Sequence, residues 1–107
     1  MSQNLSNQNQ PSQPAQAATS SFYSIEVVIQ RTGLGVLMVQ RCITYGIIHP
    51  QVAGEAAALY SENDLLRLRK VRRLVNELGL NWAGVEIVMR LTDELERLQQ
   101  ELNRLRP

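Results

Sequence analysis

Cys42 and His49 are the residues whose side chains could most readily do chemistry, and each is the only one of its type in 107 residues. A thiol beside an imidazole can act as a nucleophile pair, whereas a zinc site normally needs three or four such ligands. Cys42 falls on a predicted helix, and His49 lies in an extended segment with no orienting acid close by. Gly33 and Gly35 form only a lone GLG, without the surroundings of a phosphate loop. We therefore expect a buried thiol, a solvated histidine, no enzyme activity, no metal site and no cofactor.

A second candidate is the basic run RLRKVRRL, which places five cations between residues 67 and 73. Such a run is the simplest sequence sign of a phosphate-binding surface. However, the net charge of the chain is only +1. On a helix, which turns by about 100° per residue, Arg69, Arg72 and Arg73 share one broad face while Arg67 and Lys70 point elsewhere. The run therefore predicts the solvated side of an amphipathic helix more than a dedicated phosphate-binding surface.

The composition predicts one small domain behind a disordered tail. Residues 1–22 carry no charge and eight Asn or Gln, so they bury too little apolar surface to offset the entropy of ordering. The folded part is expected to comprise a domain at 23–80 and a long helix at 81–107. A single cysteine, no secretory signal and no apolar stretch long enough for a membrane indicate a cytoplasmic protein.

The elements that must position these residues can be read from spacing and caps. Two short helices are predicted over 25–31 and 36–45, joined by the turn TGLG. The segments IIHP and 58–60 are expected to form a small hairpin, or wing. A helix over 62–78 follows, with a capping box at Ser61 in which Asp replaces the usual Glu or Gln.

The last helix carries the strongest periodic signal, because its apolar residues recur at spacings of 3, 4, 3, 4 and 3. This is the a/d seam of a coiled coil, and we expect it to form a homodimer. The alternative is that the seam folds back onto the small domain. Asp93, Glu94 and Glu96 are expected on the outside of the coil, with Asp93 supported by Arg97 four residues later. The predicted dimerisation residues are Val88, Leu91, Leu95, Leu98, Leu102 and Leu105.

The order of elements resembles the winged-helix domain of MerR-type regulators over residues 23 to about 105. TGLGVLMVQRCITYGIIHP resembles the helix-turn-helix segment of that family without a gap, and YSEND resembles its Tyr-Ser-Glu-Glu-Asp entry to the third helix. The resemblance implies a mainly α fold, a winged helix-turn-helix with a small β-hairpin wing and a C-terminal coiled-coil helix.

The phrase ELGLNWAGVEIVMRL resembles two branches of the family with different functions. Heat-shock repressors of the HspR type bind operator DNA. Chaperone modulators of the CbpM type bind the J-domain of a DnaJ-like co-chaperone, the CbpA type, and restrain its action on the Hsp70 chaperone DnaK. The branch is decided by a few positions that can be argued physically.

The positions that hold phosphates in DNA-binding members have changed. Where those members carry a pattern like Thr-Leu-Arg-Tyr-Tyr-Glu, this chain reads MVQRCI, with Gln40 in place of the arginine. The one cation, Arg41, is displaced by one residue, which turns it about 100° around the helix. Ala58 stands where the wing arginine is expected. Because each lost phosphate contact removes about one counterion's worth of binding free energy, the resemblance favours the modulator branch.

In the modulator interpretation the partner is a J-domain co-chaperone. J-domains present a basic helix, so carboxylates near the wing are candidate contacts, together with apolar residues on the former DNA face. The predicted partner-binding residues are Glu55, Glu62, Asp64, Met38, Ile43 and Ala58. The sequence leaves open whether Ile43 and Ile47 fill the core instead, and whether Trp82 is core or a partner anchor.

The alternative is a sequence-specific DNA-binding regulator of the heat-shock type. In that case exposed cations on three predicted helices contact phosphate. The residues expected to do so are Arg31, Arg41, Arg69, Arg72 and Arg73.

Overall fold

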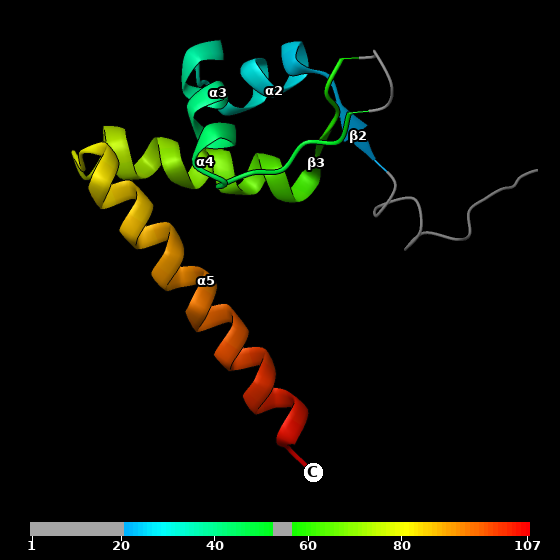
Figure 1. Ribbon diagram of the computed structural model, residues 1–107, viewed down its shortest axis with the longest axis vertical. Coiled ribbons are helices and arrows are strands. Elements are labelled where there is room, and N and C mark those ends of the chain that lie inside the picture. Colours follow the sequence, from blue (N-terminus) through cyan, green and yellow to red (C-terminus); the bar gives the residue numbers. More distant parts are fainter. Residues whose placement is uncertain (1–20, 53–56) are drawn as a thin grey trace, which may run out of the picture.

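A computed structural model describes residues 21–52 and 57–107 of the chain. The described elements are strand β2 (Phe22–Tyr23), helix α2 (Ile25–Thr32), helix α3 (Val36–Thr44), strand β3 (Tyr60–Ser61), helix α4 (Glu62–Asn76) and helix α5 (Trp82–Leu105). Helices α2 and α3 lie on one side of α4, and α5 leaves the end of α4 and extends away from the other elements (Figure 1). The predicted mainly helical fold with a small antiparallel sheet is confirmed.

Local capping explains where the helices begin. The Ser61 hydroxyl accepts a hydrogen bond from the Asp64 backbone N–H at 3.1 Å, and the Asp64 carboxylate accepts one from the Ser61 backbone N–H at 3.0 Å. The predicted capping box is therefore complete with Asp in the Glu position. Asn81 caps α5 through a 2.9 Å bond from the Gly84 N–H. Gly33, Gly46 and Gly79 all have positive φ at the turns that end or follow helices.

The predicted hairpin is corrected by the structure. Strand β3 pairs antiparallel with β2, with Tyr23 opposite Tyr60, and not with the IIHP segment. The wing keeps a single bridge, in which Gln51 and Leu59 exchange backbone bonds of 2.9 and 2.7 Å. IIHP forms no strand, and its Ile47 and Ile48 side chains are both buried in the core.

The predicted boundary of the tail also needs correction at Phe22, which lies in β2. The sequence could not show this, because the partner strand lies almost forty residues further along the chain. The remainder of the predicted tail, residues 1–20, lies outside the described residues.

Helix α4 is the centre of the core. Its buried side chains pack against α2 on one side and α5 on another, and its start carries β3. The buried side chains of α4 form one apolar stripe, as expected for an amphipathic helix in a small domain. The core consists of Val28, Leu34, Val39, Cys42, Ile47, Ile48, Tyr60, Leu65, Leu68, Val71, Leu74, Val85 and Met89. None of the described helices is long and apolar enough to cross a membrane.

Candidate partner-binding surfaces

Helix α3 has two faces with different roles. Val39 and Cys42 are buried beneath it, and Met38 and Ile43 pack against the same core from its edges. The most exposed large apolar residue on this helix is Leu37, at 85%. Sequence reasoning missed Leu37 and named Met38 and Ile43 instead. The helical phase set by the buried pair at 39 and 42 was the signal that could have found it.

An aromatic and cationic cluster lies at the C-terminal end of α3. The Arg41 guanidinium lies over the Trp82 ring, 5.4 Å from its centroid. The Tyr45 and Trp82 ring centroids are also 5.4 Å apart, with the planes inclined at 59°. Trp82 in turn packs against the core, so it supports the cluster from below. Its buried indole N–H has no acceptor among the described residues, and leaving such a donor unpaired costs about 1–3 kcal/mol.

The predicted carboxylate contacts are not all available to a partner. Asp64 is only 5% exposed, and its carboxylate is occupied by the capping box. Glu62 is exposed and accepts a 2.7 Å hydrogen bond from the Tyr23 hydroxyl. Glu55 lies outside the described residues. Ala58 is half-buried against the core. Of the five predicted contacts that lie in the described residues, Glu62 is the one that the structure places openly on the surface.

The five cations predicted for DNA contact are spread over three helices. Arg31 ends α2 and lies over the Tyr23 ring at 4.9 Å, while Arg41 lies over Trp82. Arg72 of α4 lies under the α2–α3 turn, where a Cβ at Gly33 would come within 3.0 Å of its Nε. Within the described ranges, no carboxylate forms an ion pair with any of the five, whose remaining members are Arg69 and Arg73.

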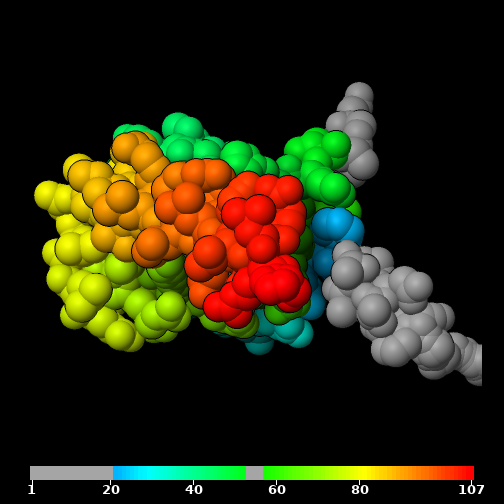
Figure 2. All heavy atoms as spheres, turned by 90° about the horizontal axis from the view of Figure 1, so that it is seen from below, coloured from blue at the N-terminus to red at the C-terminus, as the bar shows by residue number. Residues whose placement is uncertain are grey.

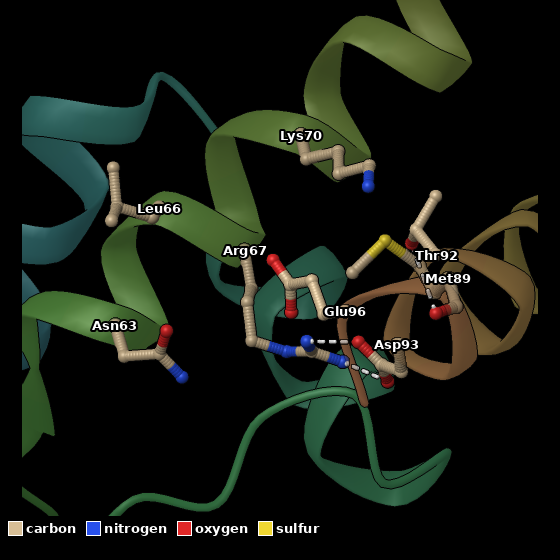
Figure 3. A pocket seen from close by; sticks show the side chains of 8 residues that line it. All are labelled: Asn63, Leu66, Arg67, Lys70, Met89, Thr92, Asp93 and Glu96. Carbon is tan, nitrogen blue, oxygen red and sulfur yellow. Dashed lines mark hydrogen bonds and ion pairs between the residues drawn. The ribbon is translucent and has the colours of Figure 1, made fainter. Parts of the chain in front are cut away.

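Arg67 and Asp93 join α4 to α5 through an ion pair that the sequence did not reveal. Arg67 donates from Nη1 and Nη2 to the two Asp93 carboxylate oxygens at 2.6 and 3.0 Å (Figure 3). It also donates from Nε to the Ile47 carbonyl at 2.6 Å. The hydrogen bond from Arg67 lowers the pKa of Asp93 below its ordinary value. Asp93 therefore connects α5 to α4 and is not simply a solvated residue on the outside of a coil. Arg97 pairs with Glu94 and not with Asp93, at 2.6 Å.

The leucine seam of α5 is open along the distal part of the helix. Val88 packs against the core, but the five leucines that follow are between 49% and 72% exposed. Figure 2 views the molecule from below, and no described element covers the distal end of α5 on that face. The seam does not fold back onto the small domain, so this alternative is wrong for the described chain. The open leucines are Leu91, Leu95, Leu98, Leu102 and Leu105.

Cys42 is placed against nucleophilic chemistry. The thiol is fully buried, and burial raises its pKa to about 11. It is therefore protonated at neutral pH, whereas the thiolate is the reactive form. His49 is exposed. Across residues 21–52 and 57–107, no three His, Cys, Asp or Glu side chains gather as a metal site.

Comparison of the sequence with known proteins identifies a family and several similar proteins. Residues 23–107 match the MerR HTH family of regulatory proteins. The chain is 25% identical over 83 residues to the chaperone modulatory protein CbpM of Escherichia coli O139:H28, which covers 78% of this chain and 81% of the relative. The CbpM of Shigella boydii serotype 18 matches with the same identity and coverage. The chain therefore belongs to the MerR helix-turn-helix regulatory family, and within that family it is similar to the CbpM chaperone modulatory proteins.

Proposed function

We propose that this protein is a chaperone modulator that binds the J-domain of a DnaJ- or CbpA-like co-chaperone and restrains its stimulation of DnaK. The observation that carries the proposal is the outer face of α3, where a leucine is almost fully exposed and Gln40 stands in place of a phosphate-anchoring arginine. An exposed apolar side chain at this position suits a protein surface better than a phosphate backbone. The relatives named as chaperone modulatory proteins support the same role. Such a role places the protein in the bacterial cytoplasm.

In this proposal the protein acts as a homodimer through α5. Residues 23–80 form the partner-binding domain, and residues 81–107 form the dimerisation helix. Helix α5 has 24 residues and is therefore about 36 Å long. Five exposed leucines at a/d spacing are costly in water and complementary to an identical seam on a second copy. A dimer presents two partner-binding domains, so two J-domains are expected for each dimer.

A titration of the purified chain with an isolated J-domain from a DnaJ- or CbpA-like protein tests the proposal. Calorimetry is expected to show saturable binding with one J-domain for each protomer. A DnaJ-like zinc-binding or C-terminal fragment without the J-domain is the control and is expected not to bind. Absence of heat or of a mobility shift at J-domain concentrations of about 100 μM, roughly −5.5 kcal/mol of binding free energy, contradicts the proposed function.

A second candidate function, DNA binding, rests on the five arginines that have no carboxylate partner within the described chain. Fluorescent duplex titrated at low and high salt tests it, because phosphate contacts make binding strongly salt-dependent. The leading proposal predicts weak binding or none even at low salt. Tight, sequence-selective binding with a steep salt dependence would instead assign the protein to the DNA-binding branch.

A further inference from the structure

We infer that the outer face of α3 is a receptor for a carboxylate-bearing segment of the partner, with Arg41 as the group that binds the carboxylate and Leu37 as its apolar neighbour. The partner's identity as a J-domain rests on the proposed function. The chemistry of the receptor rests on the side chains of α3 themselves and can be tested without that partner.

Arg41 is positioned by its neighbours, and no carboxylate of residues 21–52 or 57–107 forms an ion pair with it. Three other arginines of the described chain already form ion pairs, namely Arg67, Arg97 and Arg104. Arg41 instead lies over the Trp82 ring, and a guanidinium stacked on an aromatic ring can still donate its N–H groups to a carboxylate. A guanidinium held in this way loses little conformational freedom when it binds a carboxylate with two parallel hydrogen bonds.

Apolar side chains flank Arg41 along the helix. Leu37 lies one turn before it and Tyr45 one turn after it, so the three residues form one row. A shallow hollow of about 180 Å³ is lined by Leu37, Met38 and Arg41. The row therefore offers an apolar contact and a cation side by side, which fits a segment in which an acidic residue follows or precedes a large apolar one.

The charge of α3 and its flanking turns favours an acidic segment of the partner, which is a different part of a J-domain from its basic helix. Residues 27–52 contain two arginines and no Asp or Glu, so no carboxylate of α3 or its flanking turns repels an incoming acid. The same row is poorly suited to a nucleic acid, because a single stacked cation stands between exposed apolar side chains where several phosphate contacts are needed. A second copy of this chain is expected on the leucines of α5, at the other end of the molecule (Figure 1).

The first experiment measures J-domain affinity by calorimetry for Arg41→Glu, Arg41→Lys and Leu37→Ser. We expect Arg41→Glu to weaken binding by about 10-fold or more, and Leu37→Ser by roughly 5-fold or more, because each removes a central contact. Arg41→Lys keeps the charge but loses the planar fork, so it is expected to fall between Arg41→Glu and the wild type. The matched controls are Arg73→Glu and Leu66→Ser, exposed positions on α4, which are expected to change affinity by less than about 2-fold.

A lysine substitution of the contacted carboxylate in the J-domain is expected to weaken wild-type binding and to restore binding of Arg41→Glu. Equal affinity of Arg41→Glu and the wild type would overturn the inference while leaving the proposed function intact. The thermal unfolding midpoint of each variant, followed by circular dichroism, separates lost contact from lost fold. If Arg41→Glu is unfolded, its weak binding does not support the inference. The J-domain affinity of Arg41→Lys relative to the wild type then decides the test.

The second experiment does not need the J-domain. Trp82 is the only tryptophan, so its fluorescence reports on the guanidinium above it. A helical peptide rich in Leu and Glu is expected to change the Trp82 emission in a saturable way, and the peptide with Gln in place of Glu is not. Arg41→Gln is expected to abolish the change. No difference between the two peptides overturns the inference, whatever the J-domain does. Failure of the J-domain titration together with a Glu-specific change would overturn only the identity of the partner.

Discussion

Two sides of α5 carry apolar residues, and they differ in what those residues touch. On one side Val85 and Met89 are buried, and Asp93 follows them with its ion pair to Arg67. The leucines of the seam lie on the other side. Around the helix axis, Leu91 is about 160° and Leu95 about 120° away from Met89. The first side is completed within the chain, whereas the second needs another surface. The helix therefore carries one stripe that is buried within the fold and a second, exposed stripe that we propose mediates association.

The largest effect is expected at the seam. Leu95→Glu together with Leu98→Glu places four carboxylates in the interface of a dimer, and each buried, unpaired charge costs several kcal/mol. The double variant is expected to sediment as a monomer at concentrations where the wild type is a dimer, with unchanged helix content. Gln99→Glu with Gln100→Glu, on neighbouring positions outside the seam, is the matched control. A double variant that remains dimeric would show that the two sides of α5 do not differ in this way.

The next effect compares one apolar residue from each side in the monomeric Leu95→Glu, Leu98→Glu background. Met89→Ala removes a buried side chain and is expected to lower the free energy of unfolding by about 2–5 kcal/mol. Leu91→Ala, on the exposed side, is expected to change it by less than about 0.5 kcal/mol. Urea denaturation measures both. Similar losses at the two positions would mean that the seam packs against the domain in solution.

A smaller effect is expected when the connection between α4 and α5 is removed. Arg67→Ala leaves the Ile47 carbonyl and the Asp93 carboxylate without their donor, and an unpaired buried acceptor costs about 1–3 kcal/mol. Arg104→Ala removes only a well-exposed pair within the distal helix and is expected to cost less than about 0.5 kcal/mol. Equal losses of unfolding free energy for the two variants, measured in urea, would contradict the role given to Arg67.

The smallest effect is a pH dependence at Asp93. Because its pKa is lowered in the folded state, the pair stabilises the protein above the ordinary Asp pKa of about 4, and this stabilisation is lost as the pH falls through the folded pKa. The Asp93 side chain is 47% exposed, so solvent screens the pair and the contribution is about 1 kcal/mol or less. The wild type is expected to have a higher free energy of unfolding than Asp93→Asn at pH 7, and this difference is expected to shrink as the pH falls below the ordinary Asp pKa. A difference that does not change with pH would rule out the ion pair as its source.

The helices and their caps followed from the sequence because they depend on nearby residues. The Ser61 capping box is such a local feature, and it is confirmed. The helix ends were displaced by one or two residues, as at Asn76, where α4 stops before the predicted Leu78. Strand β2 was missed because its pairing with Tyr60 depends on residues far apart in the chain.

The candidate surfaces followed from the sequence only in part. The open leucines of α5 were named because a repeat at 3 and 4 residues is visible in one helix. The Arg67–Asp93 pair was not, because which of many charged residues meet across two helices depends on the angle between them. On α3 the predicted apolar contacts fell on the inner edge, because the buried phase set by Cys42 was not applied to choose between Leu37 and Met38.

The proposed function is to restrain a J-domain co-chaperone in its action on DnaK. The most direct measurement is the steady-state ATPase rate of DnaK, stimulated by a DnaJ- or CbpA-like protein, as this protein is added. The stimulated ATPase rate is expected to fall to the basal rate of DnaK as this protein saturates the J-domains. The basal rate itself is expected not to change. A stimulated rate that stays constant at saturating concentrations of this protein would contradict the account.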